Sequence, residues 1–95
     1  MDNKTYNITN GNYVTAITTK ENVLVIHNKN RIDPKDFYCH VIPYKSISAW
    51  SIETEEDKLT FSLTINNVDQ QLLADYNTVN LYTCRSLMTA LLEIA

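Results

Sequence analysis

The sequence predicts an α+β fold that is mainly β, in which an antiparallel sheet is closed at one end by a single C-terminal helix. Between residues 59 and 65 apolar side chains alternate with polar ones, as expected of a half-buried antiparallel strand. From residue 78 onward apolar side chains recur at intervals of three and four, the spacing of an amphipathic helix. A run of strands followed by one terminal helix is typical of α+β proteins.

The first expected elements are two strands joined by a tight polar corner. Residues 13–18 and 23–27 are rich in β-branched and aromatic side chains, and the polar residues 20–22 separate them. This arrangement predicts a hairpin. The polar segment 28–36 then interrupts the pattern, and the next strand is expected over residues 37–42.

A proline marks the point at which that strand should end. Pro43 cannot donate a hydrogen bond to a neighbouring strand and its ring fixes φ, so we expect the chain to turn a corner there. Another strand is expected to begin near Ile47. Its alternation directs Trp50 and Ile52 into the core, and the acidic run 53–57 predicts a solvated turn.

The last strands and the helix follow from clearer patterns. Residues 59–65 predict a strand, Asn66-Asn67 a turn, and residues 69–74 a strand that pairs back. Asn77 or Thr78 can accept a hydrogen bond as the N-cap of a helix that runs nearly to Ala95. The apolar stripe of this helix comprises Leu81, Cys84, Leu87, Met88, Leu91 and Ile94.

Size and composition predict one small domain. The chain has 95 residues, of which 44% are hydrophobic. We expect residues 1–12 to form a short polar N-terminal segment and residues 13–95 to form the domain. No apolar run reaches the roughly 18 to 20 residues that a membrane span needs, and residues 1–5 lack the apolar core of a signal peptide. These features predict a cytoplasmic protein.

A family resemblance is carried by residues 42–54, which read IPYKSISAWSIET. This segment resembles the I-P-Y-x-S-I-x-x-F-S-V-E-T signature of bacterial pleckstrin-homology-like (PH-like) domains. Residues 19–25 look like that family's T-N-x-R-L-I hairpin, with Asn22 at the arginine position, and residues 79–82 look like its helix start. The resemblance implies a bent antiparallel sheet, or partly open barrel, of six to seven strands capped by the C-terminal helix. It also implies homo-oligomers that assemble through their sheets.

Catalytic chemistry is not indicated by the residues. Gly11 is the single glycine, so no glycine-rich phosphate loop can form. Cys39 and His40 are neighbours in a predicted strand and point to opposite faces, which rules them out as a nucleophile and its base. The two thiols, Cys39 and Cys84, are expected to be buried and reduced, and no spacing supports a metal site with the histidines. We therefore expect a protein that is not an enzyme and has no cofactor.

Charge limits the ligands. The formal net charge of −3 argues against nucleic-acid binding, which usually requires a basic surplus. Lys29, Arg31 and Lys35 could hold one anion, although Asp33 and Asp36 among them offset the field. Weak peripheral binding to anionic lipids is therefore an alternative function, and the composition does not favour it.

Protein interaction is the function that the sequence favours. Unpaired sheet edges can add a strand from a sister subunit or from a foreign chain, so we expect a homo-oligomer or a docking module. Tyr38 and Tyr44 are candidate anchors, because their rings are apolar and their tips polar. Glu55, Glu56 and Asp57 could meet a basic surface of a partner. A small phage- or mobile-element-type inhibitor that occludes a host protein is the remaining alternative.

Overall fold

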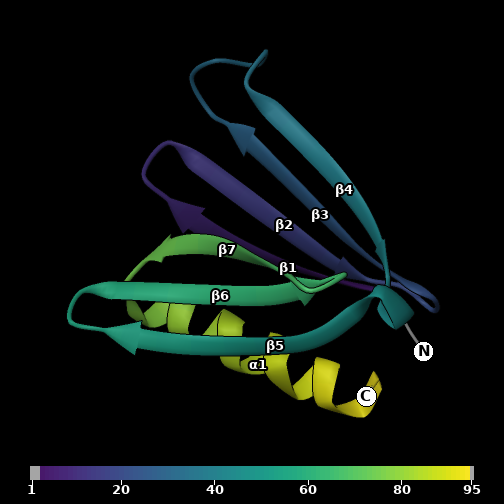
Figure 1. Cartoon of the computed structure of the whole chain (residues 1–95). Helices are drawn as coiled ribbons and strands as arrows, with labels where there is room; N and C mark the ends of the chain where they lie inside the picture. Colours follow the sequence, from purple (N-terminus) through teal and green to yellow (C-terminus); the bar gives the residue numbers. More distant parts are fainter. Residues whose placement is uncertain (1–2, 95) are drawn as a thin grey trace.

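The computed structural model describes residues 3–94, which form seven strands and one α-helix (Figure 1). The elements are β1 (Lys4–Asn10), β2 (Tyr13–Thr19), β3 (Val23–Asn30), β4 (Phe37–Pro43), the 3₁₀ turn η1 (Tyr44–Ser46), β5 (Ile47–Glu55), β6 (Lys58–Ile65), β7 (Val68–Asp75) and α1 (Thr78–Ile94). The strands form two antiparallel sheets in the orders β1-β2-β3-β4 and β5-β6-β7. The predicted α+β, mainly β fold class is confirmed. Within the described residues no ladder joins the two sheets, so the arrangement is open and is not a closed barrel.

Most of the predicted elements lie where local patterns placed them. β2 and β3 form the expected hairpin, although β3 continues to Asn30, beyond the predicted end at residue 27. Pro43 is the last residue of β4, and η1 turns the chain so that β5 begins at Ile47. Asn66 and Asn67 form a two-residue turn with φ of 51° and 68°, the left-handed geometry that tight hairpins require.

The prediction for the N-terminal segment is wrong. Residues 4–10 form β1, which pairs with β2 along its whole length, from Lys4 opposite Thr19 to Asn10 opposite Tyr13. Tyr6 and Ile8 point into the core and are almost completely buried. Two apolar residues among asparagines and threonines are too short a pattern to indicate a strand, and long-range pairing with β2 decides the outcome. Met1, Asp2 and Ala95 lie outside the described residues.

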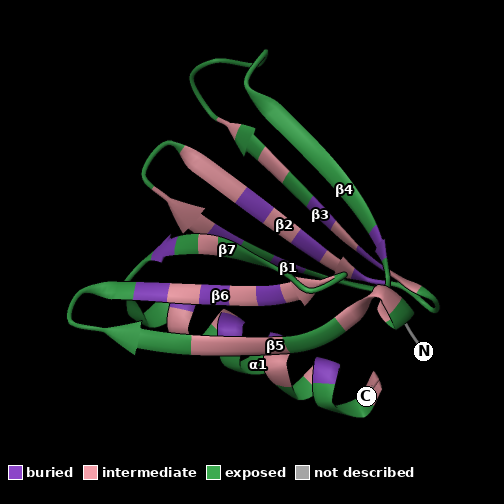
Figure 2. Ribbon diagram, viewed as in Figure 1, coloured by how far each residue is buried: buried purple, intermediate pink, exposed green. Residues whose placement is uncertain are grey.

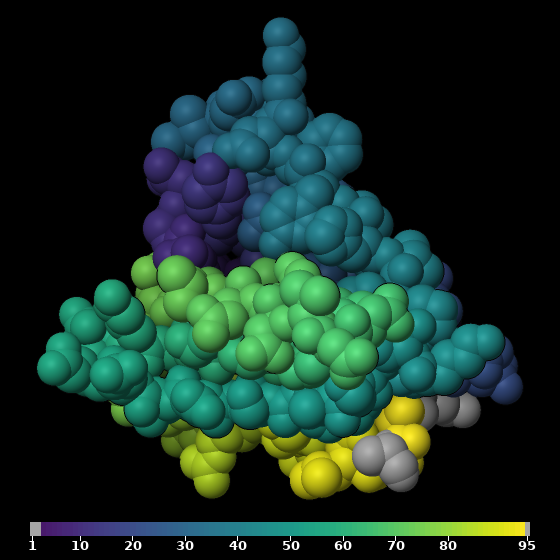
Figure 3. All heavy atoms as spheres, in the orientation of Figure 1, coloured from purple at the N-terminus to yellow at the C-terminus, as the bar shows by residue number. Residues whose placement is uncertain are grey.

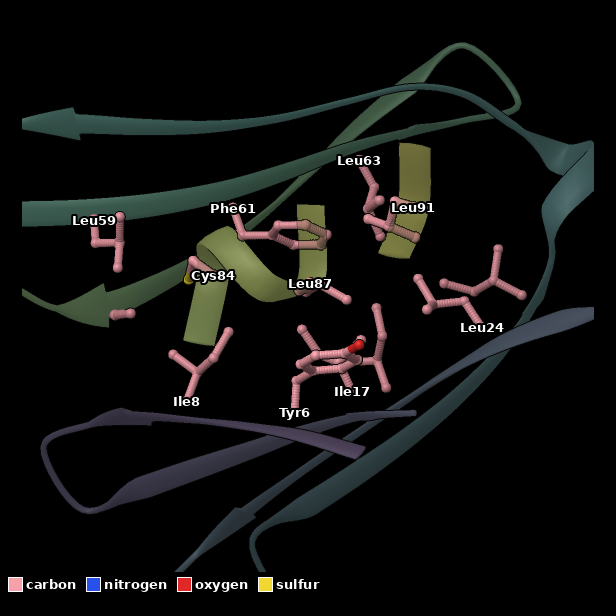
Figure 4. Close-up of a cluster of buried hydrophobic side chains, with 13 residues drawn as sticks. Tyr6, Ile8, Ile17, Leu24, Leu59, Phe61, Leu63, Cys84, Leu87 and Leu91 are labelled. Atoms are coloured by element: carbon pink, nitrogen blue, oxygen red, sulfur yellow. The ribbon is translucent and has the colours of Figure 1, made fainter. Parts of the chain in front are cut away.

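The core lies between the two sheets and the helix (Figure 4). Phe61 lies near its centre, beside the helix residue Leu87, and is 1% exposed. Trp50 and Ile52 pack against the core as predicted, but both stay half-buried because β5 is the edge strand of its sheet. The fully or almost fully buried core residues include Ile17 and Leu24 from the first sheet, Leu59 and Leu63 from the second, and Cys84, Leu87 and Leu91 from the helix.

Asn80 joins the helix to both sheets. Its side chain is 1% exposed, and its Oδ1 accepts a hydrogen bond from the Thr9 N–H at 3.1 Å. Its Nδ2 donates to the backbone carbonyls of Thr9 at 2.9 Å and of Asp75 at 2.7 Å. The amide therefore pairs with the backbone of β1 as a neighbouring strand would, and it closes this part of the β1 edge. Asn77 caps the helix, because its Oδ1 accepts from the Asn80 N–H at 2.8 Å.

Candidate functional site

The candidate interaction residues lie at separate corners of the molecule (Figure 1). Tyr38 lies in the first half of β4, and Tyr44 lies in η1 at the end of the same sheet. Glu55 is the last residue of β5, and Glu56 and Asp57 form the exposed turn before β6, where Glu56 has a φ of 53°. The turn predicted over residues 53–57 is therefore wrong for residues 53–55, which pair with β6. The structure therefore does not bring the predicted anchors together in one surface.

Tyr44, one of the two candidate anchors, is not free on the surface. Its ring packs against the core, and its hydroxyl donates a hydrogen bond to the Lys20 carbonyl at 2.7 Å. The Tyr44 N–H also donates to the Asn22 carbonyl at 3.2 Å, so this residue ties the corner after Pro43 to the β2–β3 turn. Partial burial raises the pKa of the Tyr44 hydroxyl. Tyr44 is a structural residue of the corner.

We expect Tyr44→Phe to lower the free energy of unfolding by about 1 kcal/mol, because one hydrogen bond is lost while the packed ring remains. Chemical denaturation would measure the change. Tyr82→Phe is the matched control, since Tyr82 is an exposed side chain on α1. Equal destabilisation by the two variants would contradict the assignment of Tyr44 to the corner.

The predicted anion cluster belongs to a loop that its carboxylates organise. The Asp36 carboxylate accepts hydrogen bonds from the Tyr13 hydroxyl at 2.6 Å and from the Asn30 side chain at 3.2 Å, and these bonds hold its pKa below the usual value. The Lys35 N–H donates to the Asp33 carboxylate at 3.0 Å. Lys29, Arg31 and Lys35 are all exposed. Cations and ionised carboxylates therefore share this loop, and the field at any one anion is weak.

The inner face of β4 opens on a cleft between the two sheets. The rings of Tyr38 and His40 lie 4.8 Å apart on this face, and partial burial raises the pKa of the Tyr38 hydroxyl. Together with residues of β3, β6 and β7, they line a cavity of about 280 Å³. In Figure 3 the teal atoms of β4 stand above the green atoms of β7, where the cleft lies.

The opposite, outer face of β4 is more unusual, because its apolar side chains face solvent. Phe37 is 61% exposed and Val41 is 62% exposed, with Cys39 exposed between them. Figure 2 shows β4 exposed along nearly its whole length. The prediction that both cysteines are buried is therefore wrong for Cys39, because β4 is an edge strand and Cys39 points away from the core.

The apolar outer face continues from the edge strand β4 onto its neighbour β3. Its run Val23-Leu24-Val25-Ile26 is apolar at every position, and only Leu24 and Ile26 point into the core. A strand that is apolar on both sides is normally covered on both sides. We define the outer face as Val14 and Ala16 of β2, Val25 and His27 of β3, and Phe37, Cys39 and Val41 of β4. Within the described residues of β2, β3 and β4, Lys29 is the only charged side chain that shares this side of the sheet.

The sheet register brings one thiol and one imidazole together on the outer face. Cys39 of β4 lies directly opposite His27 of β3. Burial raises the pKa of the other thiol, Cys84, to about 11, so that group stays protonated in the core. Within residues 3–94 no group of three or more His, Cys, Asp and Glu side chains is placed to hold a metal ion.

Comparisons of the sequence and the fold with known proteins found no match. No protein-family model, curated protein or solved structure matches the chain. In the part of the chain that the structure describes, no helix is long and apolar enough to cross a membrane.

Proposed function

We propose that the chain is a non-enzymatic, cytoplasmic PH-like module that assembles with a second copy of itself through the outer face. The observation that carries this proposal is the pair of exposed apolar side chains on the outer side of β4, Phe37 at 61% and Val41 at 62%, beside the half-buried Val25 of β3. Contiguous exposed apolar surface on a small protein commonly marks an interaction site. A domain of this size also gains from burying surface against a second copy.

Charge favours a second copy as the occupant of the outer face. The chain carries a net charge of −3, and its described carboxylates lie on β5, β7, α1 and the β5–β6 turn, or in the loops at the ends of the first sheet in the case of Glu21, Asp33 and Asp36. None of them belongs to the outer face of β2, β3 and β4. Two copies related by a twofold axis can therefore join their outer faces without opposing carboxylates in the contact.

The PH-like assignment is supported by the architecture as well as by the signature. Four strands, then three strands, then one terminal helix agree with the bent sheet and capping helix that the resemblance implies. The signature residues 42–54 span the end of β4, η1 and most of β5, which together form the corner between the two sheets. The proposal therefore combines a PH-like scaffold with assembly through its first sheet.

We expect Val41→Glu to convert the assembly into monomers without unfolding the chain. Val41 is 62% exposed, so its replacement removes little packing from the folded monomer. In the assembly two buried glutamates would lose their hydration, which disfavours association. Light scattering across a wide concentration range, together with circular dichroism, would measure mass and folding.

Val79→Glu is the matched control, because Val79 is 72% exposed on α1, away from the outer face. This variant should keep the mass of the wild-type assembly. A wild-type chain that stays monomeric at every concentration would refute assembly with a second copy. Equal dissociation of the two variants would refute the outer face as the contact.

A second candidate function is the addition of a strand from a different protein to β4. The two edges of the first sheet differ: Asn80 pairs with the β1 backbone, whereas in residues 3–94 no strand pairs with the far edge of β4. The β4 residues Phe37 to Pro43 carry no Asp, Glu, Lys or Arg, the charged residues that commonly protect sheet edges. A monomeric chain that captures one partner in a stoichiometric complex, lost on replacing Cys39 with proline, would favour this function, because the register directs the Cys39 N–H away from β3.

A further inference from the structure

We propose that His27 and Cys39 are half of a Zn²⁺ site that a second copy of the chain completes, so that one zinc ion bridges two copies at the outer face. This inference rests on the proposed function, because the second copy supplies the other two ligands. Zinc would be a ligand of the contact between the two copies and would regulate its formation. The four ligands would be two imidazoles and two thiolates.

The sheet register places the two side chains for chelation of one ion. His27 and Cys39 are directly opposite each other on neighbouring antiparallel strands, where Cβ atoms lie about 4.5 to 5.5 Å apart. Zinc bonds of about 2.3 Å to sulfur and about 2.0 to 2.1 Å to nitrogen can span that separation. Both side chains are exposed, and both point away from the core, because Ile26 beside His27 is buried.

The neighbours of His27 leave room for an ion and orient the imidazole. On the β2 side its cross-strand neighbour is Ala16, whose side chain is a single methyl group. On the β4 side its ring meets Phe37 edge to face, with centroids 6.3 Å apart. Val25 and Val41 lie opposite each other one step further along the same face. A second copy seated here would surround the ion with apolar side chains and exclude water.

Ligand number and charge both require the second copy. Zinc in structural sites takes four ligands in a tetrahedron, and Cys₂His₂ is one of the common sets. One chain offers two of the four, whereas a twofold axis beside the pair supplies the same two again. Each thiol releases its proton to solvent on binding, so two thiolates balance the charge of Zn²⁺. The apolar contact would then bury a site of zero net charge.

The other histidine and the other cysteine are not arranged in this way. His40 lies on the inner face of β4 against Tyr38, and Cys84 is buried in the core on α1. His40 is therefore a matched control for His27, because both are exposed and they lie on opposite faces of the same sheet. Cys84 serves as an internal reference thiol.

The test is a zinc titration of the metal-free full chain in a phosphine reductant, with mass followed by light scattering and bound metal by elemental analysis. We expect one zinc per two chains. With free zinc at 100 times its dissociation constant, linkage should strengthen dimerisation by about 100-fold. Cys39→Ser and His27→Asn should each abolish this strengthening, whereas His40→Asn should preserve it.

Every other outcome of this titration would contradict the proposed zinc site. Binding of one zinc per monomer would refute the shared site, and so would binding that survives in both Cys39→Ser and His27→Asn. A dimer that zinc neither binds nor strengthens would refute the zinc site and leave the proposed function intact. A chain that stays monomeric with and without zinc would refute both.

Alkylation of the thiols gives an independent readout. We expect Cys39 to react with iodoacetamide in the folded, metal-free chain and to be protected when zinc is added, because the metal holds the thiolate. Cys84 should stay unreactive in both conditions, because it is buried and protonated. An alkylation rate of Cys39 that zinc leaves unchanged would contradict coordination by this thiol.

Discussion

Replacing Phe61 with alanine is expected to lower the free energy of unfolding by about 3 to 5 kcal/mol. The ring is 1% exposed and lies near the centre of the core, between residues of both sheets and the helix (Figure 4). Its loss removes apolar contacts and leaves a cavity that the paired strands on either side of β6 cannot close. Small domains are often stable by only 5 kcal/mol or slightly more, so this variant should be largely unfolded near physiological temperature.

Thermal and chemical denaturation followed by circular dichroism would measure the effect. Phe37→Ala is the matched control, because it removes the same ring from a position that is 61% exposed. We expect that control to unfold at nearly the wild-type denaturant concentration and to weaken assembly instead. Two variants with equal losses of stability would show that Phe61 is not at the centre of the core.

Replacing Asn80 with alanine is expected to lower the free energy of unfolding by about 3 kcal/mol. The change removes two hydrogen bonds to the Thr9 backbone and one to the Asp75 carbonyl, and it leaves those groups to find other partners in a part-buried site. β1 would lose its attachment to the start of α1. The Gly11 N–H, which donates to the Asp75 carboxylate at 2.9 Å, would then be the main hydrogen bond left between the β1 end of the first sheet and β7.

Hydrogen exchange would separate this effect from general destabilisation. We expect the Thr9 amide to exchange faster in Asn80→Ala than the amides of β3 at the centre of the sheet. Asn7→Ala is the control, because Asn7 lies on the same strand and is exposed. Unchanged protection of Thr9, or an equal loss of stability in Asn7→Ala, would contradict the role assigned to Asn80.

The assembly proposal and the zinc proposal both assign the function of the chain to its outer face. In the proposed assembly a second copy would cover the exposed Phe37 and Val41, and zinc binding by the His27–Cys39 pair would make that contact conditional on the metal. A contact held by thiolates would weaken as pH falls, because zinc binding requires deprotonated ligands. Assembly would then follow the availability of metal as well as the concentration of the chain.

Local pattern was enough to predict most of the elements. The alternation of Leu59, Phe61 and Leu63, the proline at residue 43 and the helical spacing after residue 78 each act over a few residues. These local patterns agree with the fold because the period of a helix or a strand decides which side of the element each side chain faces. The same periods predicted that Trp50 would pack on the core, although not how much of it would stay exposed.

Asn80 and Tyr44 show where local pattern fails for individual side chains. Nothing in the residues around Asn80 indicates that its amide will meet Thr9, a residue 71 positions earlier. Tyr44 follows a proline corner, and its direction depends on the Lys20 carbonyl, which lies 24 positions earlier in the chain. Both side chains are positioned by hydrogen bonds between distant segments, and such bonds leave no periodic pattern in the sequence.

The sequence by itself determined the fold class, the approximate positions of the strands β2 to β7 and the helix, because these follow from periodicity and turn chemistry within short windows. Tertiary structure decided that residues 4–10 form a strand, that Cys39 is exposed and that His27 lies opposite it. The physical reason is that strand register is set by the sum of many cross-strand contacts between distant residues. The His27–Cys39 pair depends on that register, so local sequence patterns do not indicate it.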